Sequence, residues 1–563
     1  MDILRTISSP ADLRAVPAAD LPQLAGEIRA FLVDSLSRTG GHLGPNLGAV
    51  ELTIALHRVF EVPILFDTGH QTYVHKMLTG RLDQFDTLRT RGGMSGYPSR
   101  AESDYDWIEN SHASVALSHA DGLARNLGRV VAVVGDGSLT GGMAWEALSS
   151  IASDQVPVII VVNDNGRSYA PTVGNPLAVL EAAGIPVHGP VYGHDCGEIE
   201  KSLKNASLHD APLALHIRTH KGHGYPHVLN DELHHSTGAY DPATGIGRTG
   251  GETWTDVFSQ ELLSHFSHRD DLVAITAAMP GPTGLAPIAA SYPDRFRDVG
   301  IAEQHAVASA AGMARAGQHP VVAIYSTFFH RAFDQLLLDV SLHQLPTTFI
   351  LDRAGVTGSD GPSHNGLWDM ALCSTVPGLK LAAPRDARTL RLALEQALDV
   401  DDGPTVIRFP KGEAPQRDGR PESRELDAPG VLDLLAGNPA PNDVLIVGIG
   451  AMADIAVGVH DLLTDVGIPS SVVSPLWAAP VPAVLIDLAS QARHIVTIED
   501  GVVRGGIGSL IAESLDDAGH DLPVQRFGVP TVFPSHGSRA EILAYCGLAP
   551  GTIAEKVVLR LCR

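Results

Sequence analysis

Short apolar runs that alternate with longer, alanine-rich amphipathic stretches constrain this chain more than any other feature. Two such runs, at residues 129–137 and 156–165, enclose a stretch at Met143–Ile151 with the pattern of a helix. A buried strand, a helix and a second buried strand in this order are typical of a parallel sheet. The pattern therefore predicts an α/β fold.

The same alternation returns twice further along the chain. Strands are expected at 271–276, 319–326 and 345–352, with a helix at 302–317, and again at 443–450, 470–475 and 493–500. The chain has 563 residues, and single cores stop growing at roughly 250–300 residues. Gly- and Pro-rich stretches at 238–252 and 411–425 are candidate linkers. We expect three doubly wound, parallel or mixed-sheet domains, at 1–245, 246–415 and 426–563.

Charge and cysteine content narrow the classes of function. The formal net charge is −24, which disfavours nucleic-acid partners and anionic membrane surfaces. The four cysteines form no CxxC pair, so a disulfide framework or zinc site has no support and a reducing cytoplasm is expected. No long apolar run or signal-like start is present, so we expect no membrane span.

Two polar clusters each follow a predicted strand. Asp136 lies in a GDG sequence, and Asn165 ends an NDN sequence 29 residues later. In open parallel sheets, ligands bind at the carboxyl ends of strands, and one crossover could place the two side chains together. Carboxylate and amide oxygens suit Mg²⁺, although either cluster alone could simply be a turn. The pair predicts a site for a divalent cation and a diphosphate.

A carboxylic acid in the middle of the chain forms the second constellation. Glu303 opens an apolar helix after a strand-like DVGI sequence. A buried acid there would have a raised pKa and could exchange a proton near neutral pH. The structural alternative is an acid favoured only by the helix dipole.

Long strings of the sequence resemble one family. GDG with NDN resembles the diphosphate motif of thiamine-diphosphate enzymes, and RFRDVGIAEQHAV resembles the segment carrying their pyrimidine-binding glutamate. From about Leu13 to the C-terminus the chain is similar to 1-deoxy-D-xylulose-5-phosphate synthases, particularly those of actinobacterial type. The strings are GGHLGPNLGAVELTIALH, FDTGHQTYVHKMLTGR, GGMSGYPSRAESDYDW, VVNDNGRSYAPTVG, YSTFFHRAFDQ and DRAGVTGSDGPSHNGLWDM.

The resemblance implies a role for individual residues. The implied diphosphate and thiazolium contacts are His70, Ser111, His112, Ala113, Gly137, Asn165 and Tyr225. The implied metal ligands are Asp136, Asn165 and the backbone carbonyl of Arg167. Glu303 and Phe328 would hold the pyrimidine, and His42, His70, His235, Asp360 and His364 would surround the reacting carbon. Tyr325, Arg331, Arg353 and Arg408 would bind the acceptor phosphate. The neighbouring His234 leaves the register of His235 open.

The resemblance also implies an activity. A thiamine-diphosphate and Mg²⁺ enzyme of this family joins pyruvate to D-glyceraldehyde 3-phosphate, releases carbon dioxide and forms 1-deoxy-D-xylulose 5-phosphate, a precursor of isoprenoids, thiamine and pyridoxal phosphate. A homodimer is implied, with each active site between the first two domains of one subunit. The third domain is implied to be largely structural and dimer-forming.

Alternatives remain open at this point. A transketolase, or a paralogue with another acceptor aldehyde, would share the cofactor, and a catalytically dead scaffold would keep only the fold. A dinucleotide site after Gly448 and Gly450 is disfavoured because no acidic residue ends the next predicted strand. The chain also departs from the family, whose members carry a longer segment soon after NDN, and the connections near Glu61–Leu65 and Asn126–Arg129 are short. Substrate gating and substrate affinity are the properties that these shortened segments put in doubt.

Overall fold

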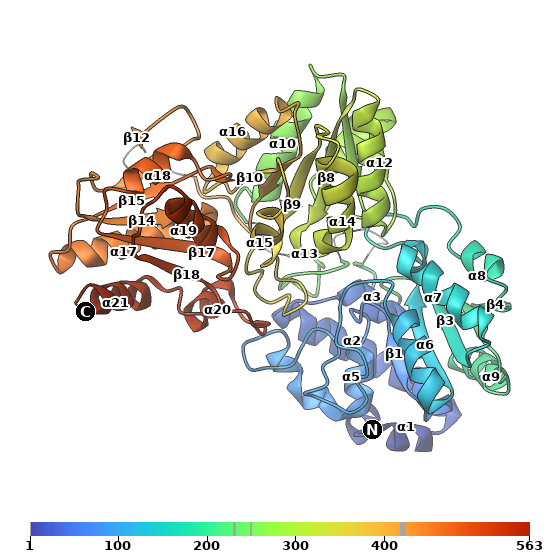
Figure 1. The fold of residues 1–563 in the computed structure, drawn as a ribbon. Coiled ribbons are helices and arrows are strands. Elements are labelled where there is room, and N and C mark those ends of the chain that lie inside the picture. Colours follow the sequence, from blue (N-terminus) through green and yellow to red (C-terminus); the bar gives the residue numbers. More distant parts are fainter. Residues whose placement is uncertain (1, 229–231, 233, 248–249, 417–423, 563) are drawn as a thin grey trace. The chain divides into compact units, whose positions relative to one another are not determined.

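The computed structural model describes residues 2–228, 232, 234–247, 250–416 and 424–562 (Figure 1). Parts of both candidate linkers, residues 248–249 and 417–423, lie outside the described residues. The chain divides into two compact units. The first contains residues 1–249 and 298–302, and the second contains residues 250–297 and 303–563. The predicted domain boundaries stay a prediction, and each unit is described by itself.

The first unit is built on a five-stranded parallel sheet. Its strand order is β1-β2-β3-β5-β4. The strands are β1 (Ile64–Phe66), β2 (Val130–Gly135), β3 (Val158–Asp164), β4 (Val187–Tyr192) and β5 (Leu213–Arg218). Both faces of β2 and β3 are buried, because alternate residues pack under α6 and α7 on one side and under α4 and α9 on the other. This explains why these strands read as unbroken apolar runs.

The helices of the first unit follow in chain order. They are α1 (Pro10–Ala15), α2 (Leu21–Thr39), α3 (Leu43–Gly48), α4 (Val50–Val59), α5 (Tyr73–Lys76), α6 (Ala116–Leu127), α7 (Gly142–Ser153), α8 (Ala178–Ala182) and α9 (Cys196–Ala206). Asp195 caps the start of helix α9, because its side chain accepts the N–H groups of Gly197 and Glu198. Such a cap satisfies amide groups that have no partner within the helix.

The second unit contains two sheets. A seven-stranded sheet has the order β16-β10-β11-β9-β8-β6-β7, in which β16 pairs antiparallel to β10. Its strands are β6 (Leu272–Thr276), β7 (Phe296–Asp298), β8 (His319–Tyr325), β9 (Thr348–Asp352), β10 (Lys380–Ala382), β11 (Thr405–Arg408) and β16 (Trp477–Ala479). A six-stranded sheet has the order β12-β13-β15-β14-β17-β18. Its strands are β12 (Arg424–Glu425), β13 (Asp433–Ala436), β14 (Val444–Gly448), β15 (Ser470–Ser474), β17 (His494–Val502) and β18 (Val524–Val529).

Helices cover these two sheets in the usual α/β manner. They are α10 (Trp254–Phe266), α11 (Ala286–Ser291), α12 (Glu303–Arg315), α13 (Ser326–Phe329), α14 (Phe333–Gln335), α15 (Asp369–Cys373), α16 (Ala387–Leu398), α17 (Ala453–Asp465), α18 (Ala483–Ala489), α19 (Ile507–Asp517), α20 (Arg539–Tyr545) and α21 (Pro550–Leu561). Helices α10, α16 and α20 begin with capping boxes. The prediction of three mostly parallel α/β sheets is confirmed.

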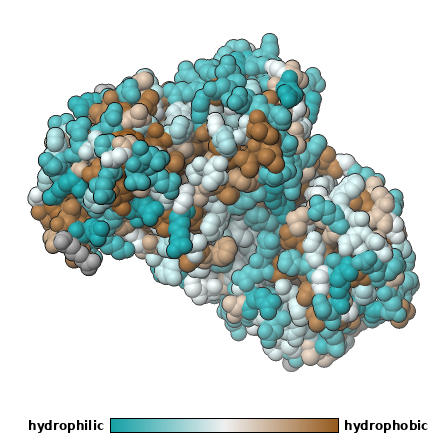
Figure 2. All heavy atoms as spheres, viewed as in Figure 1, coloured by the Kyte–Doolittle hydropathy of each residue, from teal (hydrophilic) through white to brown (hydrophobic). Residues whose placement is uncertain are grey.

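Hydrophilic residues cover much of the face drawn in Figure 2, and apolar residues form separate patches between them. One stretch of the described residues, Arg539–Leu561, is long and apolar enough by composition to cross a membrane. It consists of two helices, because α20 ends at Tyr545 and α21 begins at Pro550.

Candidate active site

The carboxyl ends of β1, β2 and β3 bring the first set of predicted residues together. Asp136 directly follows β2, and the backbone N–H of Asn165, just after β3, donates to Asp136 Oδ1 at 3.4 Å. The backbone N–H of Arg167 donates to Asn165 Oδ1 at 3.3 Å. These contacts follow from the register, since Gly135 pairs with Asn163. The structure therefore places the three predicted metal ligands side by side.

Asp136 is almost fully buried, with 2% of its surface exposed. Burial raises the pKa of this carboxyl group, a hydrogen bond from Thr172 opposes the shift, and the nearby Asp164 carboxylate adds to it. A bound cation would favour the charged form instead. The local chemistry thus fits a divalent ion held by hard oxygen ligands.

The loop that carries the predicted diphosphate contacts is held by an aspartate that the sequence interpretation missed. Asp67, directly after β1, accepts the N–H of Ser114 at 2.8 Å through Oδ1 and that of Ala116 at 2.9 Å through Oδ2. Ser111, His112 and Ala113 immediately precede these residues and lead into α6. Asp67 consequently fixes the three predicted residues at the same edge of the sheet as Asp136.

Three predicted histidines form one buried cluster. The ring centroids of His42 and His70 lie 5.6 Å apart, those of His42 and His235 lie 5.9 Å apart, and His70 stacks on His235 at 5.1 Å. Nδ1 of His70 is buried and has no hydrogen-bond partner among the described residues. His235 joins the cluster, whereas Nε2 of His234 contacts the carbonyl oxygen of Gly245 at 3.2 Å. The geometry therefore favours the predicted register.

Lys221 and Tyr169 also belong to this cluster, although sequence reasoning did not select them. Lys221 Nζ lies 2.8 Å from His235 Nδ1 and donates to the carbonyl oxygen of Ser168 at 2.7 Å. Tyr169 stacks on His235 with ring centroids 3.9 Å apart. Burial, followed by the charge of Lys221, lowers the pKa of His70 to about 3 and that of His235 well below its usual range. Both imidazoles are therefore neutral at physiological pH.

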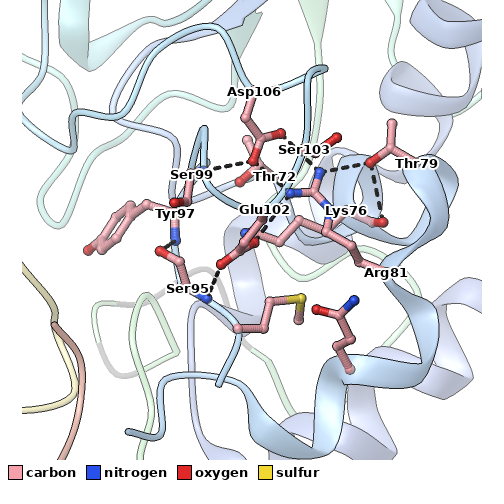
Figure 3. Close-up of polar contacts among 12 residues, drawn as sticks. Thr72, Lys76, Thr79, Arg81, Ser95, Tyr97, Ser99, Glu102, Ser103 and Asp106 are labelled. Carbon is pink, nitrogen blue, oxygen red and sulfur yellow. Dashed lines mark hydrogen bonds and ion pairs between the residues drawn. The ribbon is translucent and has the colours of Figure 1, made fainter. Parts of the chain in front are cut away.

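A buried ionic network supports the segment that faces His42 (Figure 3). Lys76 Nζ forms an ion pair with Glu102 Oε2 at 2.5 Å, and Arg81 Nη1 forms one with Asp106 Oδ2 at 2.6 Å. The two carboxylates in turn accept the backbone N–H groups of Ser95 and Ser99. Tyr97 lies between these serines, and its ring centroid is 5.5 Å from that of His42. The network thus fixes the position of an aromatic ring beside the histidine cluster.

Tyr225 contacts a different group of residues. Its hydroxyl donates to the carbonyl oxygen of Pro242 at 2.7 Å, and its ring lies 5.3 Å from that of His227. Gly137 directly follows Asp136 in the chain, and a Cβ added to it would meet Ser168 Cβ at 3.2 Å. The predicted cofactor contacts of both residues stay predictions.

Glu303 begins α12 in the second unit and is 3% exposed. Its Oε2 has no hydrogen-bond partner among the described residues. Burial raises the pKa of this carboxyl group, and the charge of Arg331 opposes the shift only in part. The result is a carboxylic acid that keeps its proton to a higher pH than an exposed glutamate does.

Two other predicted residues of this unit, Tyr325 and His364, lie beside Phe328, which is in α13. Its ring lies 5.8 Å from that of Tyr325 and 5.6 Å from that of His364, and the guanidinium of Arg353 lies 4.2 Å from the centre of the Tyr325 ring. Asp360 accepts from Lys411 Nζ at 2.6 Å, a partner that the sequence interpretation missed.

The side chain of Arg408, at the end of β11, is buried and not exposed to solvent. Nε donates to Asp369 and Nη1 donates to Asp500, both at 2.7 Å, whereas Nη2 has no hydrogen-bond partner among the described residues. Its predicted part in binding the acceptor phosphate therefore depends on the Nη2 edge of the guanidinium.

Three segments of the chain match models of known protein families. Residues 4–182 match the family model of 1-deoxy-D-xylulose-5-phosphate synthase, residues 251–416 that of the transketolase pyrimidine binding domain, and residues 438–553 that of the transketolase C-terminal domain. The 1-deoxy-D-xylulose-5-phosphate synthase of Rhodococcus jostii is 50% identical, over 99% of this chain and 95% of its own length. That of Mycobacterium tuberculosis H37Rv is 49% identical, over 99% and 97% respectively.

A solved transketolase from Campylobacter jejuni aligns over 96% of this chain and 100% of its own, with 16% identity and a TM-score of 0.46. The alignment with the Rhodococcus relative runs over 623 positions, whereas this chain has 563 residues, so at least 60 positions face gaps in this chain. This chain is therefore shorter than the Rhodococcus relative over the aligned region, whereas the position of the missing residues, after NDN, stays a prediction. The chain belongs to the 1-deoxy-D-xylulose-5-phosphate synthase family.

Proposed function

We propose that this chain condenses pyruvate with D-glyceraldehyde 3-phosphate, with loss of carbon dioxide, to give 1-deoxy-D-xylulose 5-phosphate. The observation that carries the proposal is the 50% identity to a synthase of that name over 99% of the chain. The groups that the reaction needs are present despite the shortening. They include a buried acid, a cluster of three histidines and an oxygen-rich site at the ends of β2 and β3.

Thiamine diphosphate is the cofactor that the family uses, and the described residues fit it. Glu303 Oε2 and His70 Nδ1 are buried polar atoms that have no hydrogen-bond partner in the part of the chain that the structure describes. Leaving such atoms unbonded costs about 1–3 kcal/mol each, so both are suited to contacting a ligand. When bound, the cofactor supplies a nucleophilic carbon that adds to the keto group of pyruvate and accepts the electrons released with carbon dioxide.

Mg²⁺ is the metal that the donor set supports best. Asp136 and Asn165 would supply side-chain oxygens, and Arg167 would supply its backbone carbonyl. Diphosphate oxygens and water would complete the shell, since Mg²⁺ in proteins usually keeps several such ligands. Ser111, His112, Ala113 and Gly137 would border the diphosphate.

Glu303 would act on the pyrimidine end of the cofactor. Its Oε2 would share a proton with the pyrimidine ring nitrogen, and the raised pKa of this carboxyl group favours its protonated form. Phe328 would offer an aromatic face for the ring. These two roles rest on the matching positions in the family and on the burial of Glu303.

The histidines and arginines would handle the substrates. His42, His70 and His235 would donate or accept protons around the reacting oxygens, together with His364 and Asp360. Arg331, Arg353 and Nη2 of Arg408 would bind the acceptor phosphate through charge-assisted hydrogen bonds.

We also propose a homodimer in the cytoplasm, as implied for the family. Several large apolar side chains are exposed in the chain alone, including Leu342 at 68% and Phe533 at 75%. Burial of such groups against a second copy would be favourable.

The test is carbon dioxide release from carboxyl-labelled pyruvate by the enzyme loaded with thiamine diphosphate and Mg²⁺. We expect release that rises strongly on addition of D-glyceraldehyde 3-phosphate, and loss of that activity when EDTA removes the metal. Two-carbon transfer from a ketose phosphate without carbon dioxide release would instead identify a transketolase. An enzyme inactive in both assays would contradict the proposal.

A further inference from the structure

Arg408 is oriented by two carboxylates from different parts of the second unit. Asp369, at the start of α15, accepts from Nε, and Asp500, in β17, accepts from Nη1, each at 2.7 Å. Asp500 belongs to the C-terminal domain, which we define as the residues matching the transketolase C-terminal model, 438–553. Because two donors on different nitrogens are fixed, the plane of the guanidinium is fixed and the Nη2 edge is left for a ligand.

Asp500 also binds a second arginine of the C-terminal domain. Arg539, the first residue of α20, donates from Nη2 to Asp500 Oδ2 at 2.7 Å and from Nη1 to the carbonyl oxygen of Val356 at 2.7 Å. Burial alone would raise the pKa of Asp500, but Arg408 and Arg539 outweigh it and lower the pKa to about 2. Asp500 is therefore a permanent anion that joins Arg408, Arg539 and the segment after β9.

That segment, residues 354–366, carries Asp360 and His364, and we call it the acceptor loop. Val356, near its start, and Leu367, just after it, are fully buried in the apolar core of the C-terminal domain. The N–H of Val502, at the end of β17, donates to the carbonyl oxygen of Leu367 at 3.0 Å. Both ends of the acceptor loop are thus anchored in the C-terminal domain.

Glycines allow a close approach along the middle of the acceptor loop. Gly358 and Gly361 have φ values of +92° and +83°. A Cβ on Gly361 would lie 2.5 Å from His536 Nε2, and one on Gly358 would lie 3.2 Å from the carbonyl oxygen of Gly537. A Cβ on Gly355 would collide with the carboxylate of Asp500. The loop therefore lies directly on β17 and on the residues before α20.

We propose that the C-terminal domain takes part in binding the phosphate of the acceptor. Its residues Asp500 and Arg539 are positioning residues for Arg408 and for the acceptor loop. The inference rests on the proposed function, because it assigns the Nη2 edge of Arg408 to the phosphate of the acceptor. It extends the role of this domain beyond structural support and dimer formation. Discrimination for a phosphorylated aldehyde then depends on residues that need not touch the substrate.

The experiment compares D-glyceraldehyde 3-phosphate with unphosphorylated D-glyceraldehyde as acceptors for wild type and Asp500→Asn. We expect kcat/KM for the phosphorylated acceptor to fall about tenfold or more, mostly through KM, since a charged hydrogen bond that orients Arg408 is lost. We expect kcat/KM for D-glyceraldehyde and the KM for pyruvate to change less than about threefold. The ratio between the two acceptors is the readout that general destabilisation would not move.

Asp517→Asn, an exposed change at the end of α19 in the same domain, is the matched control and should leave the ratio unchanged. If Asp500→Asn does not fold, Arg539→Gln replaces it, because that side chain is 26% exposed and its loss is tolerated more easily. An unchanged acceptor ratio in a folded, active variant overturns the inference while the proposed function stands. A wild-type enzyme that forms no product overturns the proposed function itself.

Discussion

Glu303 combines the properties that a proton-sharing acid beside a pyrimidine needs. It opens a helix, it is 3% exposed, and its Oε2 has no protein partner among the described residues. Burial is the largest cause of its raised pKa. A glutamate that only complemented the helix dipole would be exposed at the surface, where such acids are usually found.

Replacing Glu303 by alanine is expected to lower turnover by at least about 10²-fold, the range for a positioned acid. The fold should persist, since no hydrogen bond to Oε2 is lost and removal of a buried acid also removes its desolvation cost. The measurement is the initial rate of product formation together with the thermal midpoint. Glu395→Ala, an exposed change in α16, is the control. Near-normal turnover in Glu303→Ala would refute the assignment.

The sequence was most informative about polar residues next to a predicted strand or helix. Asp136, Asn165 and Glu303 could be selected because each follows or precedes a predicted strand or helix. Lys221, Tyr169 and Asp67 could not, because their contacts join segments that are distant in sequence. Asp67 reaches Ser114 and Ala116 across more than 40 positions of the chain, a pairing that no local pattern encodes.

Strands were the most predictable elements. Burial of both faces of β2 and β3 leaves an unbroken apolar run in the sequence, and the observed strands lie within the expected ranges 129–137 and 156–165. The loop at residues 92–107 shows the opposite case. Its shape depends on Lys76 and Arg81 meeting Glu102 and Asp106, and periodicity carries no signal for such ion pairs.

The end of β9 gives a prediction about pH. Burial raises the pKa of Asp352 from 3.8 to about 6, although Thr255 donates to Oδ2 at 2.6 Å. The folded state therefore holds this proton more tightly than the unfolded state, and stability falls as pH rises from about 3.8 to about 6. Asp352→Asn removes this contribution, which is at most about 3 kcal/mol.

Thermal midpoints of the wild type and of Asp352→Asn should be compared at pH 4 and pH 7. The variant is expected to gain stability relative to the wild type at the higher pH. Asp294→Asn serves as the control, because Asp294 is exposed and lies just before β7 of the same seven-stranded sheet. A difference between the two proteins that does not change with pH would show that the buried carboxyl group does not titrate as described.

The whole molecule retains its chemical groups although at least 60 aligned positions are missing relative to the Rhodococcus synthase. The segment after Asn165 reaches β4 through the short helix α8. Thr172, which lies in this segment before α8, donates a hydrogen bond from its hydroxyl to Asp136 Oδ2. Residues 298–302 cluster with the first unit, where the N–H of Ile301 donates to Thr140 Oγ1 at 2.9 Å, and Glu303 follows at once in the chain. The segments on which the proposed chemistry depends are therefore all present in the shorter chain.

The most direct test of the account is thiamine diphosphate binding, measured by titration calorimetry with Mg²⁺ and with EDTA. We predict that the wild type binds the cofactor only with the metal, and that Asp136→Asn weakens binding by at least about tenfold, or 1.4 kcal/mol. Asp83→Asn, an exposed change in the same unit, should bind like the wild type. Equal affinity with and without Mg²⁺, or an Asp136→Asn variant that binds as tightly as the wild type, would contradict the account.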